Sequence, residues 1–263
     1  MADMELPFAK KELGQHWLTD AASLEAICAA VDVGAVDTVL EIGPGLGTLT
    51  ALLVKKVREV IAIELDQRLA RELPKRVAAA NLKVVEADIL RFNLAELPAG
   101  YKVVANIPYY LTSNLIRVLS ETKTPPAQVA LLVQKEVAER VAAAPGDMSL
   151  LSVTAQWYWE VSLGRVVPSS LFTPPPKVDS QVLILKRRPK ALFPGIDEAV
   201  LFRIVKAGFS QRRKTLLNSL GAGMHIGRDE MLAMLANMGI NPAARAQTLS
   251  LEQWAKLYKS LTR

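Results

Sequence analysis

The most informative stretch of the sequence is Asn106-Ile107-Pro108-Tyr109, at the end of a predicted strand. An exocyclic aromatic amine is a poor nucleophile, because its lone pair is delocalised into the ring. Two oxygen acceptors aimed at its hydrogens favour the pyramidal geometry that attack needs, and the Asn106 side chain and the carbonyl of Ile107 or Pro108 could supply them. Tyr109 can stack on the base that carries the amine. The alternative is an ordinary turn, with tyrosines packed over the sheet edge.

A glycine-rich turn, Glu41-Ile42-Gly43-Pro44-Gly45-Leu46-Gly47, lies between a predicted strand and a predicted helix. Glycines in this position allow a tight turn and let a ligand approach the backbone. The third glycine comes one residue too early for a dinucleotide fingerprint, which would need glycine at Thr48. A pyrophosphate ligand is therefore disfavoured. Glu41 fits better beside a cationic or amino-acid ligand.

Two further carboxylates follow the next two predicted strands. Glu64 lies at the end of the second strand and can accept hydrogen bonds from both hydroxyls of a ribose. Asp88 follows the third strand and can accept from the exocyclic amine of an adenine. Because the carboxyl ends of parallel strands meet at one edge of a sheet, these features predict one nucleoside-binding crevice. A purely structural role for the glycine turn is the weaker reading.

Strands and helices alternate along the first two thirds of the chain, which predicts βαβ units and a mostly parallel sheet. The predicted strands are 38–42, 59–64, 83–86, 101–105 and 129–134, and the predicted helices among them are 48–56 and 67–80. Residues 161–167 and 178–185 have no helix between them and are expected to form an antiparallel pair at one edge.

A helical pattern follows Pro189 and Pro194. Met231, Leu232, Leu235 and Met238 share one helical face, and Gly239 is a plausible helix end. Ser250 and Gln253 form a capping-box pattern that opens the last helix. We therefore expect a domain boundary near residue 190, with an α/β domain over 1–189 and a small all-helical domain over 190–263.

Charge is unevenly distributed along the 263 residues, which carry 32 basic and 26 acidic side chains. Residues 181–263 hold 14 basic and 5 acidic side chains, a net charge of +9, whereas residues 1–180 have a net charge of −3. This basic end favours a polyanionic partner, most simply nucleic acid, and Arg212, Arg213 and Lys214 are its densest run. The alternative is a solvated helix surface. Lys10 and Lys11 are weaker candidates for the same role.

Composition excludes several classes of protein. A single cysteine, Cys28, rules out a disulfide framework, and the two histidines, His16 and His225, make a metal site improbable. No apolar run has the length of a membrane span, and no secretory signal is visible at the start of the chain. We expect a soluble, cytoplasmic protein that needs no metal, and nothing in the sequence demands more than a monomer.

Taken together, the motifs resemble those of the KsgA-type ribosomal RNA adenine dimethyltransferases, a family with the Rossmann-like class I methyltransferase fold. The resemblance covers nearly the whole chain. It is carried by Gly14-Gln15-His16-Trp17-Leu18, Glu41 to Gly47, Glu64, Asp88, Asn106-Ile107-Pro108-Tyr109, Phe172-Thr173-Pro174-Pro175-Pro176-Lys177-Val178-Asp179-Ser180, Phe209 to Leu216 and Asn218-Ser219-Leu220. The end of the chain, from Asn241 to Ala246 with Leu249 and Ser250, also favours this type.

The resemblance implies a role for each motif residue. The cofactor would be S-adenosylmethionine, bound by His16, Leu18, Glu41, Gly43, Gly45, Glu64, Leu65, Asp88, Ile89 and Asn106. The catalytic set would be Asn106, Pro108, Tyr109 and Phe172, with Tyr109 and Phe172 on the two faces of the target base. The family has asparagine where this chain has His16, and the segment 145–150 is short, which affects the expected cofactor affinity and substrate docking.

The activity implied by the resemblance is double methylation of the N6 amines of two adjacent adenosines near the 3′ end of small-subunit ribosomal RNA. The implied partner is that RNA, within a preassembled 30S particle, during ribosome biogenesis. One alternative is an Erm-type dimethylase of large-subunit RNA, whose tetrad can read the same. A second is an RNA-binding assembly factor with little catalysis. The spacing of the glycines argues against an oxidoreductase that uses NAD.

Overall fold

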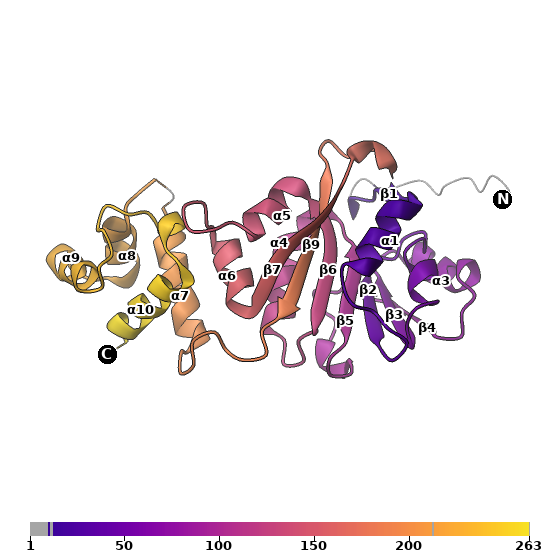
Figure 1. Ribbon diagram of the computed structural model, residues 1–263, viewed down its shortest axis with the longest axis horizontal. Helices are drawn as coiled ribbons and strands as arrows, with labels where there is room; N and C mark the ends of the chain where they lie inside the picture. Colours follow the sequence, from indigo (N-terminus) through magenta and orange to yellow (C-terminus); the bar gives the residue numbers. More distant parts are fainter. Residues whose placement is uncertain (1–9, 11–12, 212, 263) are drawn as a thin grey trace. The chain divides into compact units, whose positions relative to one another are not determined.

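The computed structural model describes Lys10, residues 13–211 and residues 213–262 (Figure 1). Backbone contacts divide these residues into two compact units. The first runs to Ala138 and resumes over Val161–Arg187, while the second contains Glu139–Glu160 and the residues from Arg188 onward. The expected boundary near residue 190 therefore has a counterpart at Arg188. Residues 139–160, which were expected in the α/β part, group with the helices instead, because α6 (Leu150–Tyr158) packs against α7 (Glu198–Phe209).

A seven-stranded sheet forms the centre of the first unit, in the order β4-β3-β2-β5-β6-β9-β7 (Figure 1). From β4 to β6 in this order, each neighbouring pair is parallel. The strands β2, β5 and β6 are rich in buried aliphatic residues, as expected where helices cover both faces of a parallel sheet. The seven strands are β2 (Thr38–Ile42), β3 (Glu59–Glu64), β4 (Leu82–Glu86), β5 (Lys102–Asn106), β6 (Gln128–Gln134), β7 (Trp159–Val167) and β9 (Ser180–Arg187).

The two final strands of the sheet break the parallel pattern. β9 pairs with β6 in the antiparallel direction, with Leu131 opposite Leu183, and β7 lies beside β9 at the edge. The strands expected over 161–167 and 178–185 are thus present. β9 lies inside the sheet, between β6 and the edge, and its residues Val182, Leu183 and Leu185 are fully buried. The position of β9 inside the sheet, paired with the buried strand β6, accounts for the apolar run that the sequence shows here.

Helices cover the sheet (Figure 1). They are α1 (Ala21–Ala29), α2 (Thr50–Leu53), α3 (Gln67–Arg76), α4 (Thr112–Glu121) and α5 (Lys135–Val141). Asp20 accepts a hydrogen bond from the Ser23 N–H at the start of α1, and Asp66 accepts from the Arg68 N–H at the start of α3. Ile27 of α1 packs with Val39 of β2 and other buried aliphatic residues in one cluster.

Two helices are shorter than the sequence pattern predicts. The helix expected over 48–56 is limited to Thr50–Leu53, and the helix expected over 67–80 ends at Arg76. In the second case Val77 leaves helical geometry and its side chain is buried beside Ala62 of β3 and Leu73. Packing against the sheet therefore ends a helix whose apolar spacing alone would allow it to continue.

The segment before α1 pairs with a segment far along the chain. β1 (Trp17–Leu18) and β8 (Phe172–Thr173) form a two-stranded antiparallel sheet in which Leu18 is opposite Phe172. Both side chains are buried in the same apolar cluster as α1. This pairing joins the Gly14–Leu18 motif to the Phe172–Ser180 motif.

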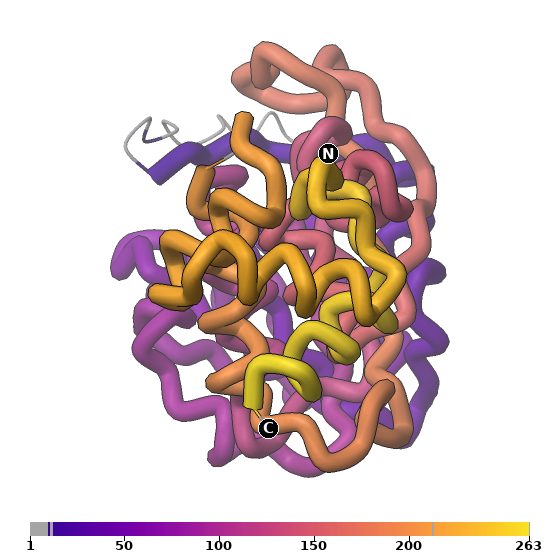
Figure 2. Tube along the Cα trace, turned by 90° about the vertical axis from the view of Figure 1, so that its left-hand side faces the viewer, coloured from indigo at the N-terminus to yellow at the C-terminus, as the bar shows by residue number. Residues whose placement is uncertain are grey.

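The second unit contains α6 (Leu150–Tyr158), α7 (Glu198–Phe209), α8 (Leu216–Met224), α9 (Arg228–Asn237) and α10 (Leu251–Leu261), the last four of which run from orange to yellow in Figure 2. Its core holds Trp254 of α10, whose ring lies 5.7 Å from that of Phe209. The expected capping box between Ser250 and Gln253 is formed. On the predicted face of α9, Met231 and Leu235 are buried, whereas Leu232 is 41% exposed.

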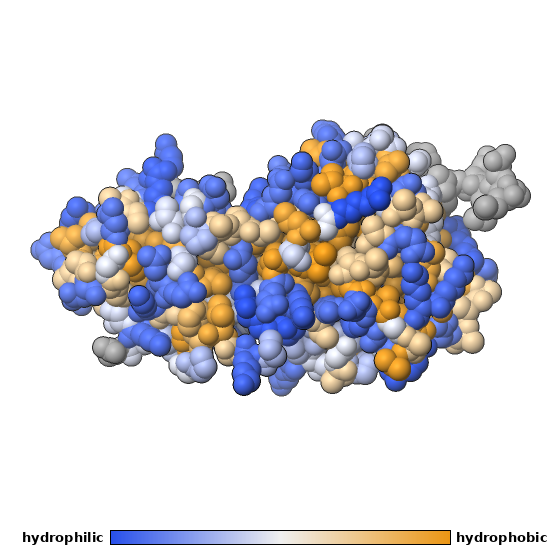
Figure 3. All heavy atoms as spheres, viewed as in Figure 1, coloured by the Kyte–Doolittle hydropathy of each residue, from blue (hydrophilic) through white to orange (hydrophobic). Residues whose placement is uncertain are grey.

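The surface mixes polar and apolar residues over the face that Figure 3 shows. Within the described residues, no helix combines the length and apolar composition needed to cross a bilayer. The same residues contain no cluster of three acidic, histidine or cysteine side chains arranged to hold a metal ion.

Candidate active site

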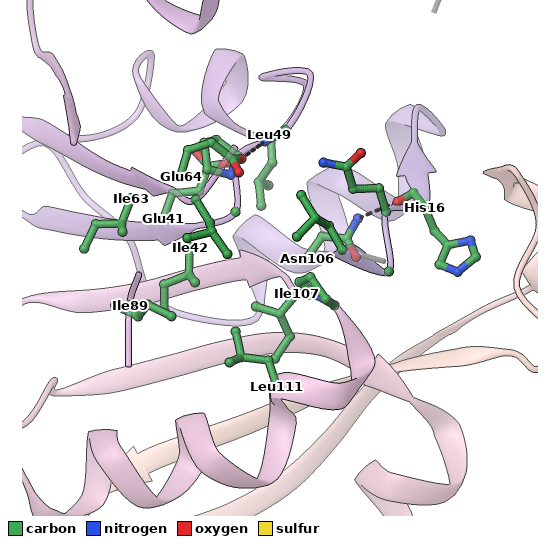
Figure 4. A pocket seen from close by; sticks show the side chains of 18 of the residues that line it. His16, Glu41, Ile42, Leu49, Ile63, Glu64, Ile89, Asn106, Ile107 and Leu111 are labelled. Carbon is green, nitrogen blue, oxygen red and sulfur yellow. Dashed lines mark hydrogen bonds between the residues drawn. The ribbon is translucent and has the colours of Figure 1, made fainter. Parts of the chain in front are cut away.

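A cavity of about 190 Å³ opens at the carboxyl ends of the parallel strands (Figure 4). Its walls come from the glycine turn after β2, the ends of β3 and β4, the end of β5 and the segment Leu13–Leu18. Of the predicted site residues, the cavity brings together His16, Leu18, Glu41, Gly43, Gly45, Glu64, Leu65, Asp88, Ile89, Asn106 and Pro108. The ends of three strands therefore meet at one crevice, as the sequence predicted.

The glycine turn depends on backbone conformations that other residues rarely adopt. Gly43 and Gly45 both have positive φ, at 65° and 57°. A β-carbon on Gly45 would lie 2.7 Å from the ring of Trp17, so the β1 segment packs directly on the turn. The Gly45 N–H in turn donates to the Glu64 carboxylate at 3.1 Å. A side chain at this position would disturb both contacts.

Glu64 is fixed by backbone groups on both sides. Its Oε2 accepts from the Gly45 N–H and its Oε1 accepts from the Asp66 N–H at 2.9 Å. The residue is 6% exposed, and burial raises the pKa of its carboxyl, although these hydrogen bonds oppose the shift. Each oxygen keeps a second lone pair, so the carboxylate can still accept from two hydroxyls in the cavity.

Glu41 is the most deeply buried acid of the site, at 1% exposure, and its Oε2 has no hydrogen-bond partner among the described residues. Burial raises its pKa to about 8, with the neighbouring Glu64 carboxylate adding to the effect and the Thr50 hydroxyl opposing it. An unpaired buried acceptor is costly, which makes Glu41 a natural partner for a cationic group in the cavity.

Leu65, Asp88 and Ile89 form the wall beyond Glu64. Leu65 is 52% exposed, and Ile89 is buried. Asp88 is half-buried and its Oδ1 accepts from the Leu90 N–H at 2.9 Å, which orients the carboxylate at the end of β4. A flat apolar ring between Leu65 and Ile89, with an amine near Asp88, is the ligand fragment that this wall suits.

The tip of β5 carries the predicted amine-binding groups. Asn106 is half-buried, and its Nδ2 donates to the His16 carbonyl at 3.5 Å. Because the amide nitrogen faces His16, the amide oxygen is the acceptor available to the cavity, and no described residue donates to it. The following residues, Tyr109–Leu111, form a short 3₁₀ turn that leads into α4.

The two predicted base-stacking rings lie apart from the cavity lining. The Tyr109 hydroxyl is 2.8 Å from Ser180 Oγ, and its ring stacks on that of His16 with centroids 5.9 Å apart. Burial raises the pKa of the Tyr109 hydroxyl. Phe172 is only 3% exposed, in the apolar cluster beneath β1. That Phe172 faces the target base remains a prediction, since this structure holds its ring in the core.

The segment before the cavity is tied to the α/β unit by an ion pair. Lys10 Nζ lies 2.9 Å from Asp66 Oδ2, and the Lys10 N–H donates to the Gln15 side chain at 2.8 Å. Burial alone would raise the pKa of Asp66, but the Lys10 ammonium and the backbone N–H groups of Arg68 and Leu69 together outweigh burial and hold the pKa below its usual value. A role of Lys10 in RNA binding stays a prediction, and Lys11 lies outside the described residues.

In the helical unit, Arg213 and Lys214 are exposed in the loop before α8, and Arg212 lies outside the described residues. Other exposed basic residues of this unit are Arg203, Lys206, Arg228, Arg245, Lys256 and Lys259. The net charge that the sequence predicts for this part of the chain is thus carried on its surface. No structural observation tests which of these residues contact RNA.

Comparison with known proteins decides the family. The model of the family described as ribosomal RNA adenine dimethylase matches residues 8–263. The chain belongs to this family. The resemblance drawn from the motifs is thereby confirmed, as is the class I methyltransferase fold with its antiparallel strands and C-terminal helices.

Two relatives of this adenine dimethylase are each named ribosomal RNA small subunit methyltransferase A. The protein from Dehalococcoides mccartyi (strain ATCC BAA-2266 / KCTC 15142 / 195) is 43% identical, over 95% of this chain and 87% of the relative. The protein from Bacillus cytotoxicus is 39% identical, over 96% of this chain and 91% of the relative. These similarities extend over both units.

Two solved structures are also similar to the dimethylase. A dimethyladenosine transferase from Plasmodium falciparum has a TM-score of 0.83 at 27% identity, covering 94% of this chain and 98% of the other. The 23S ribosomal RNA methyltransferase ErmE has a TM-score of 0.75 at 29% identity, covering 94% of this chain and all of the other. The fold therefore does not separate the two substrate classes, which agrees with the alternative left open by the tetrad.

The cofactor of the dimethylase is S-adenosylmethionine, as the resemblance implied. The cavity fits it on three counts. Glu41 offers an unpaired buried acceptor for the ammonium of the methionine part, Glu64 has free lone pairs for the ribose hydroxyls, and Asp88 suits the adenine amine.

Sequence reasoning missed several residues that shape the site. Trp17 packs on the Gly45 turn, Leu111 lines the cavity, and Ser180 holds the Tyr109 hydroxyl. Trp17 and Ser180 belong to motifs that the sequence shows, so their positions could be noticed. The sequence held no information on which residues they contact. His16 was expected to bind the cofactor. Figure 4 shows its imidazole turned away from the carboxylates, while its carbonyl faces Asn106.

We predict that Glu41 makes the cofactor-free protein less stable as the pH rises. Its pKa of about 8 in the folded protein lies above the ordinary value of 4.5, so the folded state binds more protons than the unfolded state between these values. The free energy of unfolding should therefore fall between pH 4.5 and pH 8, by about 5 kcal/mol from this residue. Glu41→Gln should flatten this slope, measured by urea unfolding across that pH range.

Glu64 provides the comparison for this experiment, since burial also raises its pKa and a residual slope should persist in Glu41→Gln. Equal slopes in the Glu41→Gln and unchanged proteins would contradict a protonated Glu41 in the cofactor-free state. The variant should also bind S-adenosylmethionine more weakly above pH 8, because the neutral amide lacks the charge that attracts the ammonium group.

Proposed function

We propose that the chain dimethylates the N6 amines of two adjacent adenosines near the 3′ end of small-subunit ribosomal RNA, with S-adenosylmethionine as the methyl donor. We further propose that the substrate is a preassembled 30S particle in the cytoplasm, met during ribosome biogenesis, and that the enzyme acts as a monomer. The names and identities of the relatives support the subunit, because both are small-subunit methyltransferases of similar length.

One observation carries the chemistry. The free acceptor of Asn106 shares a single cavity with Glu64 and Asp88, so the amine-binding tip of β5 and the nucleoside-binding ends of β3 and β4 face the same space. A cavity with only the acidic residues would bind the nucleoside of the cofactor. It would offer no acceptor to the amine of a second nucleoside, that of the RNA. The added acceptor at its mouth is what an incoming aromatic amine requires.

S-adenosylmethionine supplies an activated methyl group on its sulfonium, so the protein contributes positioning and electrostatics. Asn106 Oδ1 and the backbone carbonyl of Ile107 or Pro108 accept from the two N6 hydrogens and localise the lone pair on nitrogen. Tyr109 stacks on the base, which must be unstacked from the RNA to reach this depth. We propose that the N6 proton passes to water after transfer.

The helical unit is proposed to hold the RNA. Its exposed basic side chains attract phosphates regardless of sequence, while the cavity selects the base. In this division of labour the domain 1–189 catalyses and the domain 190–263 binds RNA. The unit found in the structure also includes residues 139–160, so the short 145–150 loop belongs to the RNA-binding side.

The similarity to ErmE supports a second candidate, methylation of large-subunit RNA. A single assay separates the two. Labelled S-adenosylmethionine is added to small subunits that lack the adenine marks, with large subunits and bare RNA in parallel, and the products are identified after nuclease digestion. Dimethyladenosine on small subunits alone is expected. Label on large subunits would favour the second candidate, and no label despite bound cofactor would favour a binding factor with little catalysis.

Asn106→Ala should reduce the rate of methyl transfer by about 100-fold, because it removes an acceptor that is aimed at the reacting amine. Binding of S-adenosylmethionine should be only partly weakened, as measured by calorimetry. Asn237→Ala is the matched control, since Asn237 is exposed at the end of α9 and makes no contact with the cavity. Near-normal turnover of Asn106→Ala would exclude the proposed role.

Changing Arg212, Arg213 and Lys214 together to alanine should weaken RNA binding and flatten its dependence on salt. Three lost phosphate contacts would reduce the slope of log affinity against log salt by about 2. The control triple Lys55→Ala, Lys75→Ala and Lys83→Ala removes the same charge from exposed positions of the α/β unit. An unchanged slope in the first triple, or equal changes in both, would show that these residues do not contact phosphate.

A further inference from the structure

His16 occupies a junction between three motifs, which its predicted role in cofactor binding does not explain. Its backbone carbonyl accepts from Asn106 Nδ2 at 3.5 Å, its ring stacks on Tyr109, and its Nδ1 lies 2.7 Å from the carbonyl oxygen of Pro174. The side chain therefore contacts the tetrad and the Phe172–Ser180 motif, while Figure 4 shows the ring directed away from the cavity.

The proton on the imidazole is located by its partner. A carbonyl oxygen can only accept, so Nδ1 must carry the hydrogen and donate it to Pro174. This bond fixes the plane of the imidazole with respect to the proline segment.

The fixed imidazole in turn constrains Tyr109. The two ring planes are inclined by only 19°, with centroids 5.9 Å apart, which is an offset-stacked arrangement. The phenol oxygen is held at the other end by Ser180 Oγ at 2.8 Å. One face of the Tyr109 ring is thus covered by His16 and its edge is anchored, so a base can stack only on the remaining face.

We propose that His16 is a positioning residue for the target base. It acts through Tyr109, by holding that ring in one orientation, and through Pro174, by tethering the proline segment beside it. This inference deepens the proposed function and rests on it for the identity of the base. The family has asparagine at this position, which can donate to the Pro174 carbonyl but provides no ring to stack on Tyr109.

Three variants separate the hydrogen bond from the ring. His16→Asn keeps a donor and loses the ring, His16→Phe keeps a ring and loses the donor, and His16→Ala loses both. His225→Asn is the matched control, because this second histidine lies in the helical unit with a left-handed backbone that asparagine tolerates well.

The first measurement uses no substrate. Deuterium exchange of the backbone amides is followed in peptides that cover residues 106–111 and 172–180. His16→Ala should speed exchange in both segments, His16→Asn mainly in the first and His16→Phe mainly in the second. The control should match the unchanged protein. Unchanged exchange in both segments of His16→Ala would overturn the proposal, whatever the enzyme methylates.

The second measurement separates the effect of each variant on kcat from its effect on cofactor binding. With small subunits as substrate, kcat of His16→Ala should fall by about three- to tenfold, the worth of one stacked ring pair, with the dissociation constant for S-adenosylmethionine changed less than twofold. His16→Phe should recover most of kcat. A loss confined to cofactor affinity would instead make His16 a cofactor ligand. If the unchanged protein methylates no substrate, the proposed function is wrong. The exchange measurement then still tests the positioning role of His16.

Discussion

The geometry of the site depends on one buried carboxylate. Glu64 accepts hydrogen bonds from the Gly45 N–H of the turn after β2 and from the Asp66 N–H at the start of α3, and so ties two neighbouring strand ends together. Asp66 then caps α3 and pairs with Lys10, which ties the first described residue to the same edge. A charge that is largely removed from water can be held here because each oxygen has a backbone donor. The ligand-binding groups are therefore organised before any ligand arrives.

The position of Asn106 follows from the same edge. β5 is parallel to both β2 and β6, so its last residue emerges beside the glycine turn. The side-chain nitrogen is occupied by the His16 carbonyl, and this leaves the oxygen for the substrate. Selectivity for an amine thus arises from how an amide is oriented by a segment distant in sequence. The helical unit needs no such accuracy, because electrostatic attraction to phosphate does not require a fixed side chain.

The sequence predicted those parts of the fold that local pattern determines. The bounds of β2 and β3 match the apolar runs, and the capping box at Ser250 follows from residue type and spacing. It could not predict that Glu139–Glu160 groups with the helices, because that depends on the contact of α6 with α7 across a long separation. The end of α3 at Arg76 was missed for a similar reason, since burial of Val77 overrides helical spacing.

In the site, too, local pattern predicted some features and contacts between distant segments determined the others. Glu64, Asp88 and Asn106 could be placed at one edge of the sheet from the sequence alone, because each lies at or just after the end of a strand and strand ends share an edge by topology. The direction of the His16 ring, the hydroxyl partner of Tyr109 and the burial of Phe172 were not accessible, because they depend on the pairing of β1 with β8. Motifs located these residues along the chain, but contacts between motifs decide what each side chain faces.

The pairing of Trp17 with Thr173 also affects when the cavity can form while the protein is being synthesised. The wall that Trp17 provides for the glycine turn emerges first from the ribosome, yet its partner strand is translated more than a hundred residues later. Because non-local pairing requires a long loop to close, β1 has no strand to join while the nascent chain is still short. A dimethylase therefore gains the paired β1 wall of its cavity only after β8, far along the chain, has been made.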